Sequence, residues 1–86
     1  MRVLIPSALH SYTGGQARVE AEGGTVRAVL ADLDRRYPGI RFRIIDEQEK
    51  IRRHIRFFHR GEMLSDLATP LAADDEFVIV QALSGG

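Results

Sequence analysis

The 86-residue sequence predicts a single α+β domain, in which a mixed sheet of about five strands carries one main helix across one face. One stretch repeats its apolar residues every three or four positions, which is typical of an amphipathic helix. Five short stretches instead have strand character, either by alternation as in "QARVEAE" or as a short apolar run as in "FVIVQAL". Their order is strand, strand, helix, strand, strand, strand. One helix can cover only one face of such a sheet, so the other face is expected to be partly open.

The composition of the chain indicates which classes of protein it can belong to. Apolar residues make up 44% and charged residues 28% of the chain, and the two kinds are too well interleaved for a disordered chain. No apolar run approaches the roughly 20 residues that span a bilayer, so no membrane partner is expected. With no cysteine, the chain has no disulfide, no thiolate nucleophile and no thiolate metal site. We therefore expect a cytoplasmic protein.

The first two strands form a hairpin with a long loop. Residues 2–6 place Val3 and Ile5 on one face and Leu4 on the other, and "QARVEAE" at residues 16–22 alternates in the same way. Between them, "HSYTGGQ" has the composition of a turn, because two glycines permit positive φ.

The stretch "GGTVRAVLADLDRRYPG" predicts the main helix. Thr25 can cap it, because a threonine hydroxyl accepts a free backbone N–H of the first turn. Its apolar residues form a single stripe: Val26, Val29, Leu30, Leu33 and Tyr37. Arg35 and Arg36 favour the last turn, and Pro38-Gly39 ends the helix.

The second half predicts a short helical turn, a second hairpin and a last strand. Ile40, Ile44 and Ile45 suit one helical turn at the edge of the core, followed by a solvated loop "DEQEK". The stretch "HIRFFHRGEML" predicts a hairpin that turns at Arg60-Gly61. A long connection should place Leu67 and Leu71 on the core, before the strand "EFVIVQ".

Alternation in these strands predicts an apolar cluster on the open face. If Ile55, Phe57, Phe77 and Ile79 face the helix, then Phe58, Val78 and Val80 face away, with Leu4 as a further candidate. Such a cluster on a monomer is typical of a docking surface for another protein. The alternatives are that residues 40–53 fold over it, or that the strands have the opposite phase.

Charge is unevenly distributed along a chain of zero net charge. Residues 41–60 carry a net charge of +4, whereas residues 61–86 carry five acidic residues and no lysine or arginine. On this pattern the C-terminal tail emerges from an acidic segment, and a basic partner surface is expected to attract it.

The polar residues contain no catalytic or metal-binding motif. His54 and His59 would point to opposite faces of a strand, so they cannot share a metal ion, and His59 is expected at the core edge with one hydrogen-bond partner. Asp74-Asp75-Glu76 is expected to be a solvated turn. The stretch "KIRRHIRFFHR" mixes basic and aromatic residues as nucleic-acid binders do, but the neutral chain argues against such a partner.

Several stretches together resemble the β-grasp sulfur carriers of the ubiquitin-like superfamily. They are Thr25-Val26 with "VLADLDRRYPG", "FFHRGE", "LAADDEFVIV" and the terminal Ser84-Gly85-Gly86. This group includes the molybdopterin-synthase small subunit, the thiamine sulfur carrier and a carrier of cysteine synthesis. The loop "YTGGQ" with "IPSAL" is most similar to the last type. Gln81 departs from the pattern, since many members have proline there.

The resemblance implies strand order 2-1-5-3-4 in a domain of residues 1–81, with residues 82–86 as a flexible tail. It implies that an E1-like enzyme uses ATP to adenylate the Gly86 carboxylate, next to Gly85, and that sulfur then replaces AMP to give a thiocarboxylate. A biosynthetic enzyme accepts the sulfur. The chain itself is then not an enzyme and binds no cofactor, because ATP and any zinc belong to the partners.

The expected docking surface adds two tail residues to the open-face cluster: Phe58, Val78, Val80, Leu83 and Ser84. Three other functions remain open. The chain could complete molybdopterin synthase as its small subunit, could modify proteins through an isopeptide bond from Gly86, or could be an interaction module with an inert tail.

Overall fold

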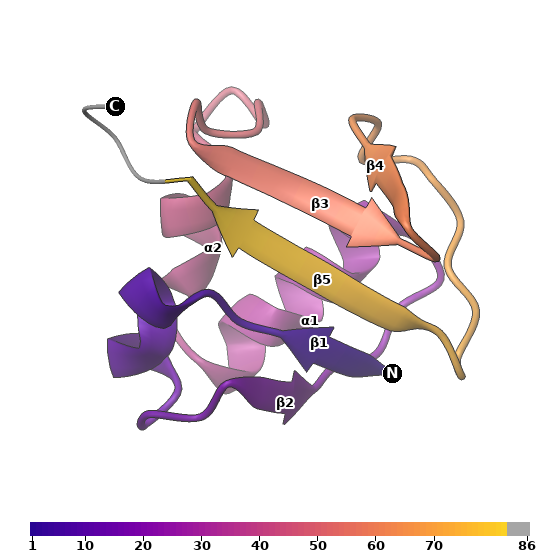
Figure 1. The fold of residues 1–86 in the computed structure, drawn as a ribbon. Coiled ribbons are helices and arrows are strands. Elements are labelled where there is room, and N and C mark those ends of the chain that lie inside the picture. The colour runs from indigo at the N-terminus through magenta and orange to yellow at the C-terminus, as the bar shows by residue number, and fades with distance from the viewer. Residues whose placement is uncertain (83–86) are drawn as a thin grey trace.

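The computed structural model describes residues 1–82, which form one five-stranded mixed sheet with its helices on one side. The elements are β1 (Arg2–Leu4), the 3-10 helix η1 (Ser7–Tyr12), β2 (Arg18–Glu20), α1 (Val26–Arg36), α2 (Ile40–Ile44), β3 (Ile55–His59), β4 (Glu62–Leu64) and β5 (Glu76–Gln81). The strand order is β2-β1-β5-β3-β4, with β1 and β5 parallel and the other pairs antiparallel (Figure 1). The predicted fold class and strand order are confirmed.

Helix α1 begins where its sequence predicts, because its first backbone N–H groups all find acceptors. The hydroxyl of Thr25 accepts the N–H of Ala28 over 3.1 Å, as expected of a cap. The connection between β4 and β5 supplies the other acceptors: the carbonyl of Thr69 accepts the N–H of Val26, and that of Leu67 accepts the N–H of Arg27. This connection therefore fixes the start of the helix as well as covering the core.

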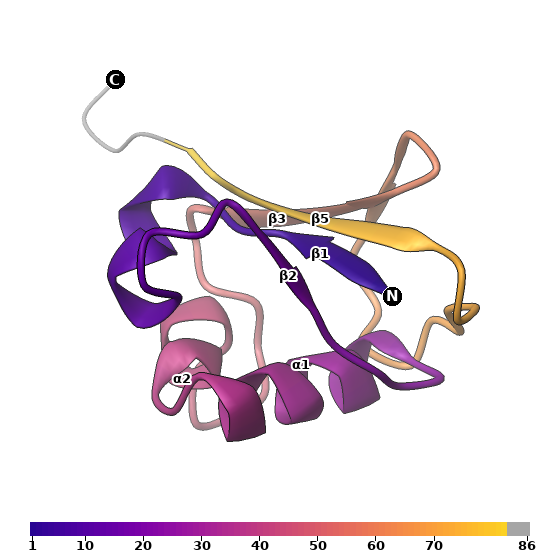
Figure 2. The ribbon, with the colours of Figure 1, turned by 90° about the horizontal axis from the view of Figure 1, so that it is seen from below.

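The core lies between the sheet and the two helices. Figure 2 shows α1 and α2 on the same side of the sheet. Ile40, Ile44 and Ile45 are fully buried there, as is most of the stripe of α1. Phe57 and Phe77 pack against each other on neighbouring strands, with ring centroids 5.1 Å apart. The segment 40–53 therefore packs on the helix side of the sheet, and the alternative in which it covers the other face is wrong.

The two hairpins differ in how much of their structure the sequence shows. Arg60 and Gly61 have φ of 53° and 80°, so the second hairpin turns through two residues at the predicted position. The long loop of the first hairpin contains η1, which the turn-like composition did not predict. Leu9 of η1 is buried, and the carbonyl of Ile5 lies 2.9 Å from His10 Nε2.

Within residues 1–82, no helix is long and apolar enough to cross a membrane.

Candidate functional site

The end of β5 is fastened to the beginning of β3. Gln81 pairs with Ile55, and the N–H of Ala82 donates to the carbonyl of His54 over 2.7 Å. The described chain therefore stops beside β3, at a fixed point of the sheet (Figure 1). The predicted site residues Leu83, Ser84, Gly85 and Gly86 lie outside the described residues, and their roles stay predictions.

The sheet face opposite the helices carries a continuous row of apolar residues. Val78 on β5 pairs with Leu4 on β1 and with Phe58 on β3, and Phe58 pairs with Met63 on β4. We call Leu4, Val78, Phe58 and Met63 the open-face row. Leu4, Val78 and Phe58 are half-buried by their neighbours, whereas Met63 is 60% exposed. Val80 follows Val78 on the same face of β5, two residues further along. It pairs with Arg56 and is 39% exposed.

The predicted orientation of Phe58, Val78 and Val80 is therefore confirmed, and their role in docking stays a prediction. The row contains no acid, base or nucleophile, so its chemistry is that of an apolar binding surface. Met63 was missed by the sequence analysis. The hairpin register could have found it, because a two-residue turn at Arg60-Gly61 places position 63 opposite position 58.

Acidic residues gather at the end of the sheet where β5 begins. Asp75 is buried there, so the expectation of a solvated turn is wrong for this residue. Its carboxylate accepts the N–H of Ala72 over 2.8 Å and contacts His59 Nε2 at 2.7 Å and Arg60 Nη2 at 2.9 Å. These hydrogen bonds, that from Ala72 first, lower the pKa of Asp75 to about 2. His59 has the single side-chain partner expected of it.

Basic residues gather at the other end of the sheet, where β5 ends. A hollow of about 370 Å³ opens there between α2 and the beginning of β3. We call it the basic hollow; it is lined by Phe42, Arg43, residues 52–55 and Gln81. Three arginines and one histidine are among these residues.

The expected electrostatic setting of the tail is therefore reversed. Residues 61–76 are acidic in sequence, but β5 carries the chain away from them by roughly 17 Å before it ends, at about 3.4 Å per residue. The last described residue lies next to His54, a lining residue of the basic hollow. An acidic partner surface, not a basic one, fits this end of the molecule.

Histidines and acids do not assemble into a metal centre in the part of the chain that the structure describes, where no group of three or more could hold an ion. The His59 and Asp75 pair lies at the opposite end of β5 from the tail. Its contacts join the β3–β4 turn to the start of β5, which is a structural role.

Known proteins match this chain over nearly its whole length. A model of the ThiS family matches residues 3–86. The sulfur carrier protein CysO of Mycobacterium tuberculosis (strain H37Rv) is 37% identical, over 98% of this chain and 96% of that protein. The crystal structure of M. tuberculosis CysO superposes with a TM-score of 0.89 at 36% identity, covering 95% of this chain and 98% of that one.

Two further structures extend the comparison. A chain in the crystal structure of the Amycolatopsis orientalis BexX/CysO complex gives a TM-score of 0.89 at 34% identity, over 99% of this chain and 98% of that one. The crystal structure of SAMP1 from Haloferax volcanii gives a TM-score of 0.77 at 26% identity, over 99% of this chain and 97% of that one. The family match, the close CysO relatives and the shared sheet agree: this chain belongs to the ThiS family of β-grasp sulfur carriers.

Proposed function

We propose that this protein carries sulfur as a thiocarboxylate on Gly86 and delivers it to a biosynthetic enzyme, with cysteine as the product. The observation that carries the proposal is the family match, which runs through the two terminal glycines to residue 86. The likeness to the sulfur carrier protein CysO supports cysteine synthesis over the pterin or thiazole routes.

The chemistry proceeds in two steps on a partner of the E1-like adenylating class. First, the Gly86 carboxylate attacks the α-phosphate of ATP, which releases pyrophosphate and leaves an acyl-adenylate. A sulfide donor then attacks the acyl carbon and displaces AMP, which leaves the thiocarboxylate. ATP and any zinc are bound by the partner enzymes, and this chain contributes the acyl group and the surfaces that present it.

Glycine suits this role because the carboxylate must approach a phosphate closely. A side chain at either terminal position would crowd that approach. The rest of the domain supports the tail: β5 is a central strand, and its end is held by Ala82 and His54. The domain thus presents the tail from a fixed point of the sheet. The protein on this proposal is a carrier and not itself an enzyme, and it works in the cytoplasm.

The test is the intact mass of the protein after incubation with ATP, sulfide and its adenylating enzyme. We expect the protein to gain the mass difference between sulfur and oxygen, at one site, only when ATP is present. Transfer to the accepting enzyme should then restore the original mass and release a sulfur-containing amino acid. A protein that keeps its mass with every adenylating enzyme of its organism would refute the proposal.

Protein modification is the second candidate, favoured by the likeness to SAMP1, which is a small archaeal modifier protein. It also begins with adenylation of Gly86, so the product distinguishes the two functions. A modifier would give ladders of conjugates on target proteins in cell extract with ATP. A carrier would give sulfur transfer to a small molecule and no ladders.

A further inference from the structure

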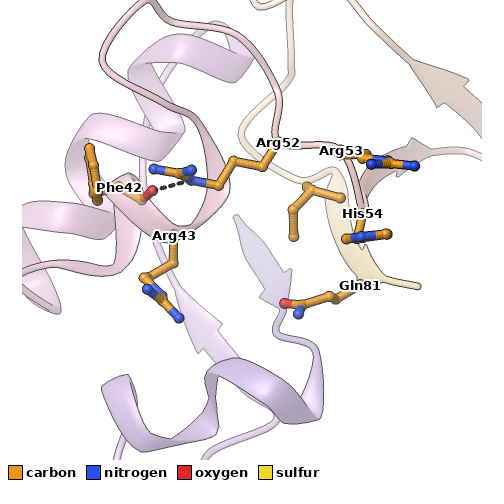
Figure 3. Close-up of a pocket in the computed structure, with 7 residues that line it drawn as sticks. Phe42, Arg43, Arg52, Arg53, His54 and Gln81 are labelled. Atoms are coloured by element: carbon orange, nitrogen blue, oxygen red, sulfur yellow. Dashed lines mark hydrogen bonds between the residues drawn. The ribbon is translucent and has the colours of Figure 1, made fainter. Parts of the chain in front are cut away.

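The basic hollow beside the tail is not explained by the fold. Figure 3 shows Arg43, Arg52, Arg53 and His54 arranged around its opening, with Gln81 of β5 on one side. Ile55 is the one buried apolar residue of its lining, whereas Arg43 and Arg53 are exposed. A fold does not need several cations in one place, because like charges repel one another.

Arg52 is already held in position. Its Nε donates to the carbonyl of Phe42 over 2.6 Å, and its guanidinium carbon lies 4.5 Å from the centre of the Phe42 ring. Phe42 itself is 53% exposed. An arginine that is stacked and hydrogen-bonded in this way has less conformational freedom to lose when it binds an anion.

Within the described part of the chain, ion pairs leave the arginines of the hollow free, although Arg52 lies near enough to Asp46 for its charge, after the N–H groups of Lys50 and Gln48, to lower the pKa of Asp46. Among residues 1–82, no ion pair involves Arg43, Arg52 or Arg53. Two carboxylates of the neighbouring loop are engaged with other groups. Glu49 pairs with Arg27 at 3.0 Å and with Arg41 at 3.5 Å, and Asp46 accepts backbone N–H groups of its own loop. The charges of Arg43 and Arg53 are therefore available to attract a ligand.

We propose that the basic hollow binds an acidic segment of the enzyme that activates Gly86. This inference rests on the proposed function. An enzyme that takes the tail must approach the end of β5, and the hollow opens at that end. The planar guanidinium groups match carboxylates in geometry, and Phe42 offers an apolar wall beside them.

Other anions fit less well. The reacting nucleotide is bound by the adenylating enzyme and meets Gly86, four residues beyond Ala82, so the hollow is not needed to hold its phosphates. A nucleic acid needs a basic track along the molecule. Here Asp75 and Glu76 pair with the basic residues at the far end of β5, and the whole chain has no net charge.

The experiment compares two double variants that remove the same charge. Arg43→Gln with Arg53→Gln neutralises the hollow, and Arg18→Gln with Arg35→Gln neutralises two exposed arginines away from it as the control. Initial rates of thiocarboxylate formation are measured by mass at varied carrier concentration. We expect the hollow variant to raise KM on the order of tenfold with kcat changed less than about twofold, and the control to match the wild type. The difference should vanish near 1 M salt, where charges are screened within about 3 Å.

The outcomes separate the two proposals. If wild type gains sulfur while both double variants have the wild-type KM, the hollow is not a docking site and the carrier function stands. If wild type gains no sulfur, the carrier function is wrong and this inference falls with it. Binding of a labelled RNA oligonucleotide that is lost only in the hollow variant, with enzyme binding unchanged, would assign the hollow to nucleic acid.

Discussion

The N–H of Ala82 donates to the carbonyl of His54 over 2.7 Å, so the tail leaves the sheet beside the residue that precedes β3. The two surfaces that we propose for partner docking lie near this point. Val80 and the open-face row lie on the sheet, and the basic hollow lies between α2 and β3. One is apolar and the other cationic, so an enzyme that takes the tail can contact both.

The first prediction separates docking from folding with neighbouring residues of β5. Val80 is 39% exposed on the open face, whereas Ile79 is 2% exposed in the core. Val80→Ser should change the free energy of unfolding by no more than about 0.5 kcal/mol and weaken binding of the adenylating enzyme. Ile79→Ala should cost about 2–4 kcal/mol, because it leaves a cavity. Urea denaturation and titration calorimetry measure the two effects.

Val80→Ser with unchanged affinity for the enzyme would remove Val80 from the docking surface. Phe58 and Val78 are less suitable as first probes, because they are half-buried by cross-strand neighbours. Their substitution mixes a loss of packing with a loss of docking.

The second prediction concerns acid stability and Asp75. Its pKa is lowered from 3.8 to about 2, chiefly by the Ala72 N–H and then by His59 and Arg60. A carboxyl group with a lowered pKa stabilises the fold above its unfolded pKa and loses that contribution as the pH falls through its folded pKa. The contribution of Asp75 should therefore be complete at pH 7 and disappear between about pH 4 and pH 2.

Asp75→Asn should lower the free energy of unfolding at pH 7 and approach wild type near pH 2. Asp74→Asn is the matched control, because Asp74 is the exposed neighbour in the same turn. Urea denaturation at several pH values measures both. Parallel pH profiles for Asp75→Asn and wild type would show that ionisation of Asp75 contributes nothing to stability.

Local patterns predicted the elements of this fold well. Thr25, the apolar stripe and Pro38-Gly39 bounded α1 closely, and alternation gave β5 as residues 76–81. These features depend on residues close together in the sequence, where periodicity and turn chemistry act directly. The orientation of Phe58, Val78 and Val80 followed from the same alternation.

Features that depend on distant residues were missed. Besides the local N–H of Ala72, the buried carboxylate of Asp75 is held by His59 and Arg60, which lie 16 and 15 residues earlier in the chain. The charge around the tail was misjudged for a related reason. Strand β5 spans the sheet, so its end lies beside Arg52 and Arg53 rather than beside the acids that precede it in sequence.

The third prediction tests the turn before α1 with two adjacent glycines. A Cβ atom on Gly23 would lie 2.6 Å from the nitrogen of Val29 and 2.7 Å from the carbonyl carbon of Ala28, both backbone atoms. Gly23→Ala must therefore move the helix, at a cost of about 1–3 kcal/mol or more. Gly24 faces open space, so Gly24→Ala should stay within about 0.5 kcal/mol of wild type. Equal urea midpoints for the two variants would contradict this account of the turn.

The last prediction concerns the length of the tail. Deleting Gly86 shortens the chain by one residue, so the carboxylate sits roughly 3.5 Å short of the α-phosphate. A displacement of about 1 Å can cost on the order of a hundredfold in rate, so the deletion should nearly abolish the gain of sulfur. Gly86→Ala keeps the reach and only crowds the approach, so it should be slower than wild type and faster than the deletion. The free energy of unfolding should stay the same in both, because glycine has no side chain to bury.

Intact mass after incubation with ATP, sulfide and the adenylating enzyme measures the three rates, with urea denaturation as the control for folding. A deletion variant that gains sulfur as fast as wild type would show that Gly86 is not the site of activation and would favour an interaction module with an inert tail.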